Sequence, residues 1–271
     1  MSGGDGRTPR FPLRLDKVGP ARPHAAPVLR PQAPVQQAHA DAARRSAPAG
    51  LGLDSADVRA RMVARLRRDG VASAAVLEAF AAVPRHAFVD AALVTQAYED
   101  TSLPIGHGQT ISKPSVVARM LELLHAGANA RTLGQLGSVL EIGTGCGYQA
   151  ALLAQQARRV VSIERLRALH DKARELLGPL RLDRVRLVYG DGMQGHAPNA
   201  PYDSIIAAAG GEALPQAWLD QLAVGGRLVA PLARPGQRDQ VLVVVDRRAD
   251  GYVHQVHEAV KFVPLKSGRS G

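Results

Sequence analysis

The fold of this chain is decided by one stretch of its sequence, Val139-Leu140-Glu141-Ile142-Gly143-Thr144-Gly145-Cys146-Gly147-Tyr148. Four residues of strand character are followed by three glycines at alternate positions, and an apolar helical pattern begins at Tyr148. In open α/β sheets, ligands bind where a strand ends in such a turn, because glycine has no Cβ and lets a ligand approach the backbone. The helix start after the turn also offers free amides. The stretch therefore predicts a small-molecule site at the end of a buried strand.

The spacing of the glycines distinguishes between two cofactor classes. A dinucleotide site favours Gly-x-Gly-x-x-Gly, which would place the third glycine at Tyr148. The chain instead has Glu-x-Gly-x-Gly-x-Gly, with Glu141 at the strand end, and this is similar to motif I of the class I methyltransferases. S-adenosylmethionine carries an ammonium and a sulfonium but no pyrophosphate. We expect Glu141 to lie near its positive methionine end, directly or through water, where it would repel a pyrophosphate.

Two further acids follow later strands of the same pattern. Glu164 ends the second strand, where a carboxylate can accept hydrogen bonds from both ribose hydroxyls of either cofactor. Asp191 follows the third strand, where the acid of this fold usually contacts the adenine amino group. Taken singly, either acid could instead be a helix N-cap or a solvated side chain. The residues of this part of the expected S-adenosylmethionine site are Glu141, Gly143, Thr144, Gly145, Gly147, Glu164, Asp191 and Gly192.

Short apolar runs alternate with helical patterns from residue 138 onward. The runs lie at 139–142, 160–163, 185–188, 204–208, 227–231 and 241–245. The helical patterns lie at 148–156, 166–177 and 215–222. This alternation predicts an α/β fold of the Rossmann-like class I methyltransferase type, with a mostly parallel sheet and helices on both faces. The last runs, with 252–263, have no helix between them and predict an antiparallel C-terminal hairpin.

The first half of the chain divides into a tail and a helical element. Residues 1–52 are expected to be a disordered tail rich in Pro, Ala and Arg, because proline blocks helices and sheet ladders and no apolar periodicity is present. Within a methyltransferase domain at 53–271, residues 53–130 form an N-terminal helical and substrate element, 131–250 the cofactor-binding core, and 251–271 a C-terminal strand and tail. Helices are expected at 54–69, capped by Asp54 or Ser55, and at 73–83 and 114–125, with an irregular segment at 84–113.

Composition limits the alternatives. The formal net charge of the 271-residue chain is +10, but residues 1–50 carry half of it, so the charge is weak support for nucleic-acid binding by the folded part. No apolar run is long enough to span a membrane, and no secretory signal is evident. The single cysteine, Cys146, excludes an internal disulfide and fits a small loop residue better than a nucleophile. We expect a cytoplasmic monomer with no metal, membrane partner or specific nucleic-acid partner.

One segment upstream of the glycine turn carries a specific resemblance. The chain reads Gly-His-Gly-Gln-Thr-Ile-Ser-Lys-Pro at 106–114 and Phe-Val-Pro-Leu at 262–265. Both segments resemble the protein-L-isoaspartate O-methyltransferase family, as do Arg85, Phe88 and Tyr98. Together with the segments at 201–205, 215–219 and 222–228, the resemblance covers about residues 54–268. It departs from the family at Lys113 and Ser115, where many relatives have other residues.

The resemblance implies a function and further site residues. The family transfers a methyl group from S-adenosylmethionine, leaving S-adenosylhomocysteine, to the carboxylate of L-isoaspartyl residues in age-damaged proteins and peptides. The ester then closes to a succinimide, which opens in part to normal aspartate. Ser112 is implied as the active-site residue that orients the carboxylate, whereas His107 is expected to be a bystander. The resemblance places Gln109, Thr110 and Ile111 at the cofactor, and Val263, Pro264 and Leu265 beside the peptide groove.

Two other functions remain compatible with parts of the sequence. A methyltransferase acting on a small-molecule carboxylate or hydroxyl would use the same fold, although the segment Thr110-Ile111-Ser112 argues against it. A non-catalytic nucleic-acid-binding protein could retain the fold, although the intact glycines and strand-end acids argue against this. The Asn/Asp-Pro-Pro-aromatic segment that amino methyltransferases of DNA carry after the fourth strand is replaced by alanines and glycines at 207–211.

Overall fold

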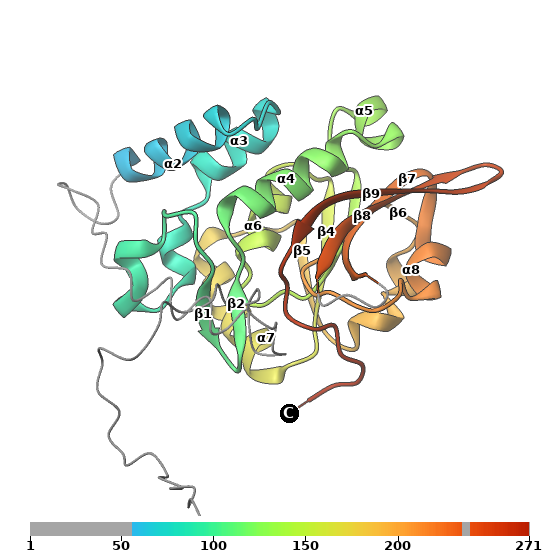
Figure 1. Cartoon of the computed structure of the whole chain (residues 1–271). Coiled ribbons are helices and arrows are strands. Elements are labelled where there is room, and N and C mark those ends of the chain that lie inside the picture. Colours follow the sequence, from blue (N-terminus) through green and yellow to red (C-terminus); the bar gives the residue numbers. More distant parts are fainter. Residues whose placement is uncertain (1–55, 235–238, 271) are drawn as a thin grey trace, which may run out of the picture.

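The computed structural model describes residues 56–234 and 239–270, which form one α/β unit with a helical layer at its N-terminal side (Figure 1). The expected tail at 1–52 and the expected helix cap at Asp54 or Ser55 lie outside the described residues.

A seven-stranded sheet in the order β5-β4-β3-β6-β7-β8-β9 forms the centre of the molecule. Its strands are β3 (Ser138–Ile142), β4 (Arg159–Glu164), β5 (Val185–Tyr189), β6 (Tyr202–Ala207), β7 (Leu222–Ala233), β8 (Gln240–Arg248) and β9 (Gly251–Val260). The first five run parallel, whereas β8 is antiparallel to both of its neighbours. The predicted parallel sheet with an antiparallel C-terminal hairpin is confirmed. The strand order reverses at β3, because β4 and β5 lie on one side of β3 whereas β6 and β7 lie on the other. The sheet therefore has a topological switch point between β3 and β6, at the carboxyl end of β3.

The central strands are buried on both faces, as their continuous apolar runs predict. Every residue of β3 is buried. Val139 belongs to the hydrophobic core on one face, and its neighbours Leu140 and Ile142 belong to a second core on the other. This division follows from the alternation of side chains along a strand.

Helices cover the two faces unequally. The first face carries most of them: α2 (Ala56–Arg68), α3 (Ala74–Ala82), α4 (Pro114–His125), α5 (Ala128–Leu133), α6 (Tyr148–Ala154) and α7 (Arg167–Leu177). The second face carries α8 (Gln216–Gln221), with Trp218 in its core, and the 3₁₀ turns η5 (Gly192–Gln194) and η6 (Ala197–Asn199). The predicted helices at 54–69, 73–83 and 114–125 are confirmed within the described residues.

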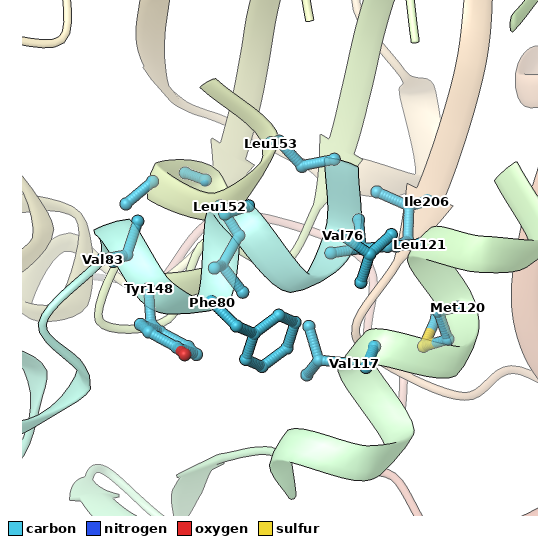
Figure 2. Close-up of a cluster of buried hydrophobic side chains, with 14 of the residues drawn as sticks. Val76, Phe80, Val83, Val117, Met120, Leu121, Tyr148, Leu152, Leu153 and Ile206 are labelled. Carbon is cyan, nitrogen blue, oxygen red and sulfur yellow. The ribbon is translucent and has the colours of Figure 1, made fainter. Parts of the chain in front are cut away.

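The N-terminal helices pack through apolar side chains onto the part of the fold that contains the glycine turn. Figure 2 shows Phe80 of α3 lying between Tyr148 of α6 and Val117 of α4. The rings of Phe80 and Tyr148 meet edge to face, with centroids 6.2 Å apart. Helix α3 therefore packs against both α4 and α6, and α6 is the helix that follows the glycine turn.

The segment at 84–113, expected to be irregular, contains regular structure. It holds the 3₁₀ helices η2 (Arg85–Phe88) and η3 (Ala91–Gln96) and a two-stranded antiparallel hairpin of β1 (Leu103–Gly106) and β2 (Gln109–Ile111). The hairpin turns at His107, which has a φ of 52°. The strands are three and four residues long, too short for an alternating pattern to be recognised.

In the part of the chain that the structure describes, no helix is both long and apolar enough to cross a membrane.

Candidate active site

A cavity of about 380 Å³ opens at the carboxyl ends of β3 and β4. It is enclosed by the glycine turn at 143–146, the β1–β2 hairpin, the start of α7 and the segment at 263–270. Its volume lies within the range of about 300–1,000 Å³ typical of small-molecule sites. Its place at the topological switch point is where ligands bind in sheets of this kind.

Backbone hydrogen bonds fix the glycine turn to the neighbouring strand. The amides of Gly143 and Thr144 both donate to the carbonyl of Ile163, at 2.9 and 3.2 Å. The amide of Gly145 donates to Oε2 of Glu164 at 2.9 Å. These three amides therefore hold the turn in place and are not free for a ligand.

Glu164 joins the glycine turn to the start of α7 through two hydrogen bonds. Besides the bond from Gly145, its Oε1 accepts a hydrogen bond from the amide of Leu166 at 2.9 Å, at the start of α7. The side chain is 5% exposed and lines the cavity. Both carboxylate oxygens are thus held by backbone donors, and their remaining lone pairs can accept from a ribose diol.

Glu141 lies behind the cavity wall. It is completely buried, and its Oε2 accepts a hydrogen bond from the hydroxyl of Ser162 at 2.5 Å. That hydroxyl is 2.6 Å from Oγ1 of Thr144, which does line the cavity. Burial raises the pKa of Glu141 to about 8, against the opposing effect of the hydrogen bond from Ser162. In the described part of the chain, its Oε1 has no hydrogen-bond partner.

Asp191 lies beside the cavity and caps the turn after β5. Its Oδ1 accepts from the amide of Met193 at 2.9 Å, and its Oδ2 accepts from the amide of Gly268 at 2.7 Å. The adjacent Gly192 does line the cavity. The carbonyl of Gly192 accepts the indole N–H of Trp218 at 2.8 Å, so this buried tryptophan is a core anchor that fixes the turn.

Ser112 enters the cavity from the other side, directly after β2. Residues 109–112 all line the cavity. The carbonyl of Ser112 accepts a hydrogen bond from Nη2 of Arg85 at 2.7 Å. Asp100 accepts from both the amide and the hydroxyl of Ser115, at 2.8 and 2.7 Å, and so fixes the start of α4. Within residues 56–234 and 239–270, the hydroxyl of Ser112 has no hydrogen-bond partner, and it is therefore available to a ligand.

The segment Val263–Leu265 borders the cavity on a third side. The amide of Gly210 donates to the carbonyl of Val263 at 2.9 Å, and the amide of Leu265 donates to the carbonyl of Gly210 at 2.8 Å. This short parallel bridge uses one backbone edge of the segment. Val263, Pro264 and Leu265 all line the cavity that Ser112 lines.

Most of the site residues expected from the sequence thus share one cavity. Glu141, Gly147 and Asp191 do not line it but lie in its supporting wall or turns. The residues that line the cavity but were not expected there include His107, Cys146, Tyr148, Gln149, Arg165, Leu166, Lys266 and Ser270. Those at 146–149 could have been found from their position in and after the glycine turn, whereas Lys266 and Ser270 reach the cavity through the path of the C-terminal segment.

The donor set of this cavity fits S-adenosylmethionine. The strand-end acid Glu164 suits a ribose, and the buried Glu141 holds an unpartnered oxygen behind the turn. The amides of residues 143–145, which a pyrophosphate would need, are bonded within the protein. Among the described residues, no group of three or more His, Cys, Asp or Glu is placed to hold a metal ion. The fold and the site together define a Rossmann-like S-adenosylmethionine-dependent methyltransferase.

Sequence comparisons with a family model and with two relatives give the same enzyme family. Residues 57–270 match the family model described as protein-L-isoaspartate(D-aspartate) O-methyltransferase. A protein-L-isoaspartate O-methyltransferase of Methylibium petroleiphilum is 65% identical over 270 residues, covering 99% of each chain. One of Leptothrix cholodnii is 60% identical over 274 residues, covering 97% of this chain and 96% of its own. The chain belongs to the protein-L-isoaspartate(D-aspartate) O-methyltransferase family.

Solved structures show the same fold. A structure titled protein-L-isoaspartate O-methyltransferase superposes with a TM-score of 0.69 at 27% identity, covering 77% of this chain and 66% of that one. A putative enzyme of the same name from Plasmodium falciparum, solved in complex with S-adenosyl-L-homocysteine, gives a TM-score of 0.62 at 23% identity. It covers 76% of this chain and 97% of its own, and at this identity it shows the fold alone.

Proposed function

We propose that this protein transfers the methyl group of S-adenosylmethionine to the free carboxylate of L-isoaspartyl residues in damaged proteins and peptides. The reaction starts their repair to aspartate. The observation that carries this proposal is the position of Ser112. The family's Gln-Thr-Ile-Ser segment brings a hydroxyl without a partner among the described residues into the same cavity as the glycine turn of the cofactor site.

The chemistry needs orientation more than acid–base catalysis. Bound S-adenosylmethionine supplies an electrophilic methyl group, and the acceptor must approach it in line with the leaving sulfur. A carboxylate acceptor is already ionised at neutral pH, so no general base is required. In the proposal, the hydroxyl of Ser112 donates a hydrogen bond to one carboxylate oxygen and so orients the carboxylate for transfer. Holding a nucleophile in such a geometry can supply much of the rate enhancement.

The other site residues are assigned to the cofactor and the peptide. Glu164 accepts from the ribose hydroxyls, Asp191 serves the adenine side, and Glu141 acts on the cationic methionine end through Thr144 and Gln149. Gln109, Thr110 and Ile111, with Gly143, Thr144, Gly145 and Gly192, surround the cofactor, and Gly147 supports it by shaping the turn. Val263, Pro264 and Leu265 flank the peptide, with one backbone edge already paired to Gly210.

We further propose a role for each part of the domain. Residues 53–130 supply the substrate side, 131–250 bind the cofactor, and 251–271 close the site. The protein acts in the cytoplasm as a monomer and has no specific nucleic-acid partner. The alanines and glycines at 207–211 support the absence of a specific nucleic-acid partner, since amino methyltransferases of DNA carry their Asn/Asp-Pro-Pro-aromatic segment there.

A pair of peptides tests the proposed function. One carries an L-isoaspartyl residue and the other the same sequence with normal aspartate, and labelled S-adenosylmethionine is the methyl donor. We expect initial transfer to the first peptide alone. Small carboxylates such as free aspartate and succinate serve as a third arm. Transfer to these at comparable kcat/KM, without transfer to the isoaspartyl peptide, would overturn the proposal in favour of a small-molecule methyltransferase.

A further inference from the structure

A buried arginine lies directly behind the proposed acceptor site. Arg85, the first residue of η2, is 0% exposed. Its Nη2 donates to the carbonyl of Ser112 at 2.7 Å and more weakly to that of Thr101 at 3.4 Å. No carboxylate of residues 56–234 or 239–270 forms an ion pair with it. Charged side chains are rarely buried without such a partner, because desolvation of the charge is costly.

The guanidinium makes one further contact but remains short of hydrogen-bond partners. Its carbon lies 4.9 Å from the ring centroid of Tyr148, a residue that lines the cavity. Nε and Nη1 are buried without a hydrogen-bond partner in the described part of the chain. Burial lowers the pKa of Arg85, although an arginine remains protonated at neutral pH. The fold thus retains a costly positive charge that its own side chains do not compensate.

The carboxylate of Asp100 acts electrostatically on this arginine but is already used by another residue. It is bound by the amide and the hydroxyl of Ser115 at the start of α4. An anion that binds at the hydroxyl of Ser112 would therefore be the partner that the buried charge lacks, at the same residue whose carbonyl accepts its shortest hydrogen bond.

We propose that Arg85 is a positioning residue for the acceptor: it fixes Ser112 through the Ser112 carbonyl, and its uncompensated charge favours binding of the isoaspartyl carboxylate. The inference rests on the proposed function of Ser112 but concerns a residue to which that function gives no role. Because the charge attracts the carboxylate before transfer and has less effect once the ester is formed, its main effect is on substrate affinity. Removal of the charge should raise the peptide KM more than it lowers kcat.

The experiment compares Arg85→Met and Arg85→Lys with a matched control, Arg65→Met. Arg65 also donates through Nη2 to a backbone carbonyl, that of Tyr98 at 2.7 Å, and its Nε is also buried without a partner among the described residues. It belongs to α2 and does not line the cavity. The control therefore reports the cost of losing a partly buried arginine in the N-terminal layer, without an effect on Ser112.

The readouts are the peptide KM and kcat, the affinity for S-adenosylhomocysteine, and the thermal midpoint. For Arg85→Met we expect the KM of the isoaspartyl peptide to rise at least about tenfold, because the attraction between the buried charge and the carboxylate is lost. Affinity for S-adenosylhomocysteine should stay within about twofold, and Arg85→Lys should recover part of the peptide KM. Arg65→Met should leave the peptide KM unchanged.

Binding of the isoaspartyl peptide to the protein saturated with S-adenosylhomocysteine is measured in parallel, so that the inference does not depend on turnover. If the wild-type protein neither binds nor methylates this peptide, the proposed function is overturned, and the inference with it. A wild-type protein that methylates the peptide while all three variants keep its KM would overturn the inference alone. An equal loss of peptide and S-adenosylhomocysteine binding in Arg85→Met and Arg85→Lys would also overturn it, because it would show a purely structural role.

Discussion

The hydroxyl of Ser162 in β4 donates a 2.5 Å hydrogen bond to the carboxyl group of Glu141 in the neighbouring strand β3. The same hydroxyl contacts Thr144 in the glycine turn. Glu141 therefore acts on the cavity through its neighbours. The acid that distinguishes this turn from a dinucleotide site is part of the wall, and its charge state follows from its burial.

The titration of Glu141 should be visible in the stability of the protein. Burial raises its pKa from 4.5 to about 8, so the folded state holds this proton more tightly than the unfolded state. The contribution of Glu141 to stability is then fully present below about pH 4.5 and is lost as the pH rises to about 8. Glu141→Gln removes this dependence. From pH 5 to 8.5, urea unfolding should show the variant gaining about 2–4 kcal/mol relative to wild type. A difference that is constant over this range would contradict the assignment.

Binding of S-adenosylmethionine should also involve this proton. A cationic ligand end near Glu141 favours the ionised carboxylate, so binding at pH 7 should release a proton in the wild type. Calorimetry in buffers of different ionisation enthalpy measures this release. We expect it to be lost in Glu141→Gln, and equal proton release by the two proteins would show that another group titrates.

Replacement of Ser112 should affect transfer and leave the cofactor bound. In Ser112→Ala the carboxylate loses the hydroxyl that orients it, and kcat/KM for the isoaspartyl peptide should fall by about 100-fold. Affinity for S-adenosylhomocysteine, measured by calorimetry, should stay within about twofold. The matched control is Ser115→Ala, which loses the hydrogen bond to Asp100 at the start of α4 and should cost about 1 kcal/mol of stability. If Ser112→Ala keeps the wild-type rate, Ser112 does not orient the acceptor.

Glu164 should be required for the cofactor. Glu164→Gln replaces one of the two oxygens that accept from Gly145 and Leu166 by a donor, and it removes the negative charge facing the ribose. Affinity for S-adenosylmethionine should fall about tenfold to a hundredfold. Glu175→Gln, on the exposed side of α7, is the control and should bind the cofactor as the wild type does. Equal affinities of the two variants would remove Glu164 from the cofactor site.

The last glycine of the turn should be needed for folding more than for ligand contact. Gly147 has a φ of 92°, and a Cβ there would lie 3.0 Å from the side chain of Leu177 in α7. Gly134 also has a positive φ, of 66°, but a Cβ there would meet open space. Gly134→Ala should therefore cost about 1 kcal/mol and Gly147→Ala about 3 kcal/mol, measured by urea unfolding. Equal costs would contradict the close packing of Gly147.

The sequence was sufficient to predict the central sheet because the signal there is local. The central parallel strands β3, β4 and β6 are mostly buried and read as largely apolar runs, and the glycine turn follows the first of them directly. The β1–β2 hairpin was not predicted, since its strands are three and four residues long and its stability comes from packing against other elements. The predicted helix at 114–125 was confirmed because Pro114 and an amphipathic pattern both indicate its start.

The site was predictable to the extent that its residues follow strand ends. Glu164 reaches the cavity, whereas Glu141, one position earlier relative to its strand end, shares the face of Val139 and points into the wall. The contact between Arg85 and Ser112 joins residues 27 positions apart through a backbone carbonyl, and no spacing or periodicity in the sequence indicates such a contact.

The central claim is tested most directly by locating the transferred methyl group. The isoaspartyl peptide is incubated with the protein and methyl-labelled S-adenosylmethionine, and the product is analysed by fragmentation in a mass spectrometer and by its lability in base. We predict one methyl group on the free carboxylate of the isoaspartyl residue, released as methanol in base, with the peptide recovered as succinimide and then partly as normal aspartate. A base-stable methyl group on any other atom, or no methylation while the cofactor is bound, would contradict the account.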